Sequence, residues 1–67
     1  MVSIYKRENL KTINNEIAAN MELRGLSTDE KPTEINNIII DNGSMFIEID
    51  TGKLFLYDLE NEEWEEI

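Results

Sequence analysis

The sequence predicts a small α+β domain that is mainly β, an antiparallel β-meander of three to four strands with an N-terminal helix or arm. Between residues 41 and 64, turn-forming residues separate short runs in which apolar and polar residues alternate, as they do in half-buried strands. Between residues 9 and 24, apolar residues recur at spacings of three and four, as on an amphipathic helix. We therefore divide the chain into an N-terminal arm or helix (1–24), an ordered connector (25–37) and a β-meander module (38–67).

The N-terminal segment carries one apolar stripe at helical spacing, formed by Leu10, Ile13, Ile17 and Met21. Asn9 is placed to cap the start of this helix, and Gly25 falls where a left-handed residue commonly ends one. An isolated helix of roughly 12 to 15 residues is marginal in water, so this one needs a surface to pack on. The stripe either covers the protein's own sheet or docks on another chain, and we treat residues 1–24 as a candidate anchor.

The connector contains residues that favour an ordered loop. Ser27, Thr28 and Asp29 have side chains that bond to nearby backbone, and Pro32 forces Lys31 toward an extended conformation. We expect residues 25–37 to be ordered without a regular element.

Three turns organise the meander. Asp41, Asn42 and Gly43 form a turn signal of the hairpin type, because Asn and Gly tolerate positive φ. The second turn is formed by Asp50, Thr51, Gly52 and Lys53, with Gly52 in a left-handed position, and a third turn spans residues 58–62.

The second turn sets the expected pairing of the strands on either side of it. If Thr51 and Gly52 form the tip, Ile47 lies opposite Leu56 and Phe46 lies opposite Tyr57. One face of the sheet then forms the predicted core, which comprises Met45, Ile47, Ile49, Leu54, Leu56 and Trp64.

The other face is also partly apolar, since it carries Phe46, Phe55 and Tyr57. One short helix covers only one face of a sheet, so the second needs a partner, a second copy of the chain, or the N-terminal arm. The candidate interface residues are therefore Leu10, Ile13, Ile17, Met21, Phe46, Phe55 and Tyr57.

The composition excludes several kinds of chemistry. The chain has no Cys and no His, which removes a disulfide framework, a thiolate nucleophile, an imidazole base and the usual zinc sites. Glu48, Asp50 and Asp58 are the carboxylates most able to gather near the hairpin, but their spacing does not match a calcium loop. We predict that the protein is not an enzyme and has no catalytic, cofactor-binding or metal-binding residues.

The charge of the chain argues against nucleic acid as a partner. The net charge is −9, and residues 45–67 hold eight acidic residues against one lysine, Lys53. Such a surface repels phosphate backbones; it suits a basic partner, or it serves solubility alone. Residues 38–40 are three consecutive isoleucines, far short of the roughly 20 apolar residues that a helix needs to cross a membrane, so no membrane partner is expected.

Two blocks of the sequence, "GLSTDEKPT" and "NGSMFIEIDTGKLFLYDLENEEW", resemble small virion proteins of tailed bacteriophages that infect low-GC Gram-positive bacteria. The resemblance covers Gly25 to Trp64. It implies a structural part of the particle without enzymatic activity, often trimeric or placed on a symmetry axis. It also implies that residues 50–53 make the hairpin tip, and that Tyr57, Asp58 and Trp64 close the module.

These considerations lead to three hypotheses about function. The first is a subunit of the capsid decoration or head-fibre type, made in the host cytoplasm and located on the particle surface. Its partners would be copies of itself, with a trimer favoured, and a larger phage shell or tail protein. The second is an accessory or fibre protein of the tail or baseplate. The third, from another class, is a small acidic regulator or inhibitor that mimics nucleic acid.

Overall fold

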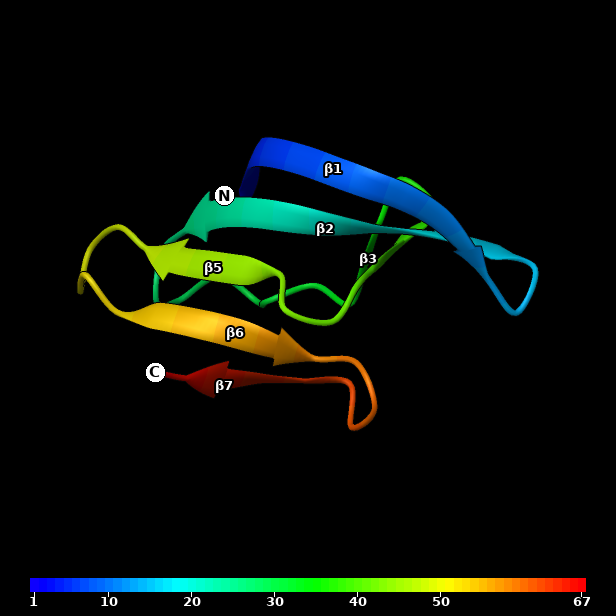
Figure 1. The fold of residues 1–67 in the computed structure, drawn as a ribbon. Helices are drawn as coiled ribbons and strands as arrows, with labels where there is room; N and C mark the ends of the chain where they lie inside the picture. The colour runs from blue at the N-terminus through cyan, green and yellow to red at the C-terminus, as the bar shows by residue number, and fades with distance from the viewer.

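The computed structural model describes all of residues 1–67 and is all-β (Figure 1). The prediction of an α+β fold with an N-terminal helix is wrong, since the chain forms one mixed sheet that curls into half a barrel. No helix in it is long and apolar enough to cross a membrane. The seven strands are β1 (Ser3–Ile13), β2 (Glu16–Gly25), β3 (Glu34–Ile35), β4 (Ile38–Ile40), β5 (Met45–Glu48), β6 (Leu54–Asp58) and β7 (Glu63–Glu66).

The segment predicted as a helix is a long antiparallel hairpin of β1 and β2. Asn14 and Asn15 form its tip with φ of 50° and 67°, the two positive values that a type I′ turn requires. Asn9, expected to cap a helix, lies in an irregularity of β1 with φ of 57° and donates from Nδ2 to Asn20 Oδ1 over 3.1 Å. From Ala19 onward, burial along β2 follows a period of two, as in a strand: Ala19, Met21, Leu23 and Gly25 are buried and alternate with half-buried residues, while Ala18 is buried as well.

Gly25 ends a strand, so its predicted role at a helix end is also wrong. A Cβ at this position would lie 2.8 Å from Cζ of Phe46. The glycine is therefore explained by the close approach of an aromatic ring to the backbone.

Strand β2 lies at the centre of the sheet. One edge pairs with β1, and the other pairs first with β4 and then with β5, both parallel to β2. Residues 41–44 separate these two strands along the same edge. The predicted turn at Asp41 to Gly43 is thus present, with φ of 84° at Gly43, but it links two successive parallel strands and makes no hairpin.

The parallel pairing requires the chain to cross over after β2. Residues 26–33 make this crossing behind the layer that contains β2, β5 and β6, and the β3–β4 hairpin follows (Figure 1). Asn36 and Asn37 form the tip of that hairpin with φ of 52° and 65°. The region predicted as a connector thus contains the two-residue strand β3 as well as the crossing segment.

Strands β5, β6 and β7 form an antiparallel meander with a register different from the predicted one. Residues 49–53 form a longer loop than the expected two-residue tip, with Gly52 at φ of 74°. Ile47 consequently pairs with Leu54, and Phe46 pairs with Phe55. Beyond the third turn, Trp64 lies opposite Tyr57 and Glu63 lies opposite Asp58.

The core lies on the face opposite to the predicted one. Phe46 is fully buried and meets Trp64 edge to face, with ring centroids 5.8 Å apart, while the centroids of Tyr57 and Trp64 are 4.9 Å apart. Trp64 is the one predicted core residue that packs against the buried cluster, which comprises Ala19, Met21, Leu23, Ile40, Phe46 and Tyr57. The other five predicted core residues lie on the outer face: Met45, Ile47, Ile49, Leu54 and Leu56.

Candidate docking surface

Four apolar side chains form a continuous patch on the outer face of the sheet, and we call them the outer apolar stripe: Met45, Ile47, Leu54 and Leu56. They make two direct cross-strand pairs, because Met45 lies opposite Leu56 and Ile47 lies opposite Leu54. Leu54 is 38% exposed and Leu56 is 41% exposed, while Met45 and Ile47 are half-buried. Ile49, 64% exposed, continues the same alternation just beyond the end of β5.

Charged residues flank this stripe on both sides. On β2, Glu22 lies opposite Met45 and Arg24 lies opposite Ile47. On β7, Glu65 lies opposite Leu56. An apolar centre within a polar rim is the usual organisation of a protein–protein interface.

The two charged residues of β2 that flank the stripe, Glu22 and Arg24, contact each other. Nη2 of Arg24 lies 3.4 Å from Oε2 of Glu22, and Cζ of Arg24 lies 3.7 Å from the centre of the Tyr5 ring. Nε of Arg24 is buried without a hydrogen-bond partner. The guanidinium group is therefore held beside the stripe by the ring and the carboxylate.

The inner face of the same strands is closed by a charged pair from the crossing segment. Nζ of Lys31 lies 2.7 Å from Oε2 of Glu48, and the two side chains are 17% and 6% exposed. The ammonium group also lies 4.9 Å from the centre of the Phe46 ring and 4.3 Å from that of Phe55. The hydrogen bond from Lys31, supported by a second one from Thr51, lowers the pKa of Glu48 below its usual value.

Two further contacts hold the crossing segment on the inner face. The hydroxyl and backbone N–H of Ser27 donate to the carboxylate of Asp50, over 2.6 and 2.9 Å, and these bonds lower the pKa of Asp50. Nε1 of Trp64 donates to the carbonyl of Pro32 over 2.8 Å. With the inner face covered in this way, the outer face is the apolar sheet surface left open to a partner.

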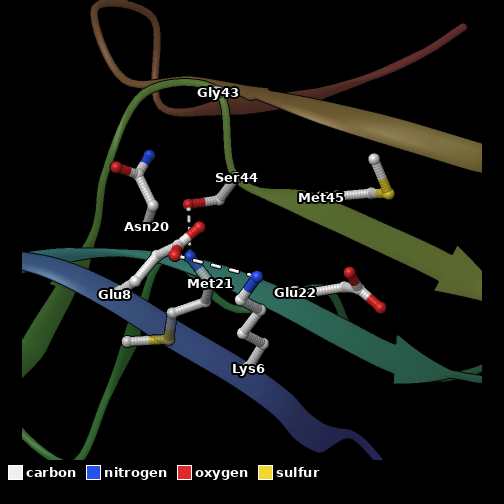
Figure 2. Close-up of a pocket in the computed structure, with 8 residues that line it drawn as sticks. All are labelled: Lys6, Glu8, Asn20, Met21, Glu22, Gly43, Ser44 and Met45. Atoms are coloured by element: carbon white, nitrogen blue, oxygen red, sulfur yellow. Dashed lines mark hydrogen bonds and ion pairs between the residues drawn. The ribbon is translucent and has the colours of Figure 1, made fainter.

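A polar hollow of about 170 Å³ lies between β1, β2 and the start of β5 (Figure 2). Its one hydroxyl belongs to Ser44, which accepts from Met21 N over 3.0 Å and donates to Asp41 O over 2.8 Å. Lys6 and Glu8 face each other from β1 with 3.7 Å between their charged atoms. The hydroxyl is thus occupied by backbone hydrogen bonds, and the hollow has a structural role.

The three candidate carboxylates are not gathered into one site. Glu48 binds Lys31, Asp50 binds Ser27, and Asp58 accepts from the side chain of Asn61 over 2.8 Å. No three acidic residues lie close enough together to hold a metal ion.

The predicted interface residues fall into two groups. Met21, Phe46 and Tyr57 are buried and Phe55 lies beneath Lys31, so these four do not form a docking face in the folded chain. Burial raises the pKa of Tyr57 above its usual value. The others lie near the tip of the β1–β2 hairpin, where Leu10 and Ile17 are exposed and Ile13 is half-buried.

The residues of the predicted turns have specific partners. Asp41 is buried and its carboxylate lies 2.7 Å from Nζ of Lys11. Asn42 accepts from Leu59 N through its side chain and from Asn20 Nδ2 through its carbonyl. The turn at residues 41–44 thus joins β1, β2 and the end of β6.

The sequence reasoning missed two features that shape the site. The pairs Asn14–Asn15 and Asn36–Asn37 mark type I′ turns. Isoleucines lie close on both sides of each pair, Ile13 and Ile17 around the first and Ile35 and Ile38 around the second, which was the available signal. The pairing of Lys31 with Glu48 has no local signal, since it joins residues far apart in the sequence.

Comparisons of the chain with protein-family models, with curated proteins and with solved structures find no match.

Proposed function

We propose that this protein is a non-enzymatic structural subunit that docks on a larger protein assembly through the outer apolar stripe. The observation that carries the proposal is the arrangement of Met45, Ile47, Leu54 and Leu56 as two adjacent cross-strand pairs on an open face. The opposite face is occupied by the protein's own core and crossing segment.

Burial of this stripe is the free-energy source for docking. Each Å² of apolar surface removed from water contributes roughly 25 cal/mol, and the cross-strand pairs place the four side chains next to one another for a partner to cover. A small interface of this kind gives modest affinity for one copy. On a symmetric lattice many copies bind at equivalent positions, and links between neighbouring copies add avidity.

We place this assembly in the virion of a tailed bacteriophage, at the capsid surface. The support is the sequence resemblance, together with the way its two blocks contact each other. Ser27 bonds to Asp50, Lys31 bonds to Glu48, and the carbonyl of Pro32 accepts from Trp64. The resemblance therefore covers one folded unit in which each block stabilises the other.

Quantitative mass spectrometry of purified phage particles tests this proposal. The particles are prepared from the bacterial strain whose genome encodes this sequence, and peptides of this chain are measured relative to the major capsid protein. We expect a fixed ratio with many copies per particle. Presence of the chain in the cell lysate and its absence from the particles would overturn the proposal.

A further inference from the structure

We propose that the protein associates with copies of itself head to tail, with β1 of one copy pairing antiparallel with β7 of the next. This goes beyond docking through the outer apolar stripe, because it uses two edge strands of the sheet, β1 and β7, and leaves the stripe free.

Strands β1 and β7 each pair with only one other strand of the sheet. Strand β1 pairs only with β2, and β7 pairs only with β6 (Figure 1). Half of the backbone N–H and C=O groups of each strand therefore point away from the sheet and are free to pair with another strand. Every residue of β1 except Ile13 is exposed.

The two edges carry opposite charge. Strand β1 has three basic residues, Lys6, Arg7 and Lys11, against Glu8, whereas β7 has three glutamates and no basic residue. The six ion pairs of the structure leave Arg7, Glu63 and Glu65 without a partner.

This charge distribution selects between the possible edge pairings. Two β1 edges would bring basic residues together, and two β7 edges would bring glutamates together, so both symmetric pairings are opposed by repulsion. Pairing of β1 with β7 brings opposite charges together. Repulsion between like charges thus opposes a two-fold dimer through either strand, and attraction between opposite charges favours a head-to-tail contact of β1 with β7.

Strand direction permits the same contact. Strand β1 is antiparallel to β2, and β7 runs in the direction of β2 because it follows two antiparallel steps from β5, which is parallel to β2. A copy placed beside the first by rotation about an axis along the strands sets β7 antiparallel to β1. The mixed sheet then continues from one copy to the next.

Sedimentation equilibrium of charge-reversed variants tests the proposal. The wild type is examined up to about 1 mM protein at low salt and at about 0.5 M salt, where exposed charges are screened. One variant reverses β1 (K6E/R7E), a second reverses β7 (E63K/E65K), and a third combines all four changes. A control, E30K/E60K, changes two exposed glutamates that lie in connecting segments outside the strands, neither of which forms an ion pair.

We expect concentration-dependent association of the wild type and of the control, weaker at high salt. Each single-edge variant should remain monomeric, and the combined variant should associate again, because its two edges are complementary with the signs exchanged. A monomeric wild type, loss of association in only one of the two single-edge variants, or no recovery in the combined variant would overturn the proposal. Circular dichroism verifies that each variant is folded, and the neutral change E63Q/E65Q replaces the β7 reversal if that variant unfolds.

Discussion

At the scale of single residues, the contact between Lys31 and Glu48 makes it possible to bury the inner face of the sheet, where Glu48 lies. Glu48 alternates with the outer stripe and so points to the inner face, where an unpaired carboxylate would be costly. The ammonium group of Lys31, 2.7 Å away and close to two aromatic rings, makes that position tolerable. The pair therefore allows a strand with an acidic residue on its inner side to pack against the core.

The first prediction concerns the pH dependence of this contact. Because the folded state lowers the pKa of Glu48, the unfolded chain binds its proton at higher pH. The stabilisation is complete above the unfolded-state value of about 4.3 and is lost as pH falls through the lower folded-state value. The variant Glu48→Gln should thus be less stable than wild type at pH 7, and the difference in free energy of unfolding should shrink below about pH 4.

Urea unfolding of both proteins between neutral and acidic pH measures this difference. Glu60→Gln, a change at an exposed residue without an ion pair, is the control and should leave the stability nearly unchanged. A difference between Glu48→Gln and wild type that stays constant across the whole pH range would contradict this account.

At the scale of elements, β2 keeps a nearly continuous set of hydrogen bonds although its partner strand is interrupted. The backbone of Asp41 donates to Ala19 O over 2.9 Å, and the side chain of Ser44 accepts from Met21 N over 3.0 Å. Ser44 Oγ thus takes the place of the backbone carbonyl that a continuous strand would offer. The turn at residues 41–44 is in effect a side-chain bridge between β4 and β5.

The second prediction follows from this bridge. Ser44→Ala would leave the buried N–H of Met21 without an acceptor, which should lower the free energy of unfolding by about 1–3 kcal/mol. Thermal or urea denaturation measures the loss. Ser44→Thr, which retains a hydroxyl, is the informative comparison, and equal stability of Ser44→Ala and wild type would refute the role given to Ser44.

The third prediction concerns the tip of the β1–β2 hairpin. Asn15 has a φ of 67°, a value that glycine adopts freely and alanine does not. Asn15→Ala should lower the stability by about 1 kcal/mol, whereas Asn15→Gly should preserve or raise it. Chemical denaturation of the matched pair tests the assignment, and equal stability of the two variants would contradict a left-handed conformation at this position.

How far each element could be predicted depends on the range of the interactions that form it. The β5–β6–β7 meander could be anticipated because its turn residues are local signals. The β1–β2 hairpin was predicted as a helix because Leu10, Ile13, Ile17 and Met21 fit a period of 3.6. A period of two along β2 was equally available, through Ala19, Met21 and Leu23.

Which face of the sheet is buried could not be predicted from the sequence, for a different reason. Alternation shows that Phe46 and Ile47 lie on opposite sides of a strand but does not show which side is covered. Here the cover is the crossing segment, held by Lys31 and by the carbonyl of Pro32. Such long-range contacts have no periodic signature in a single sequence.

At the scale of the whole molecule, one face of the curled sheet is closed and the other is open. The closed face holds the aromatic core, and the open face presents the outer apolar stripe between charged residues of β2 and β7. Docking through the stripe and association through the sheet edges use separate surfaces and are compatible in one assembly.

The fourth prediction concerns the stripe itself. In the variant L54T/L56T, two exposed leucines become polar residues that still favour strands, so the fold should persist. Loss of the apolar contact should weaken docking about tenfold or more. The matched control is I17T, which removes an apolar side chain of similar exposure at the other end of β2, outside the stripe.

Co-sedimentation with phage particles that lack this chain is the most direct measurement of the central claim. Wild type, L54T/L56T and I17T are added at equal concentration, after near-ultraviolet circular dichroism has shown that Trp64 is packed in all three. The account predicts that wild type and I17T sediment with the particles and that L54T/L56T stays in solution. Equal binding of L54T/L56T and wild type would show that the outer apolar stripe is not the docking surface.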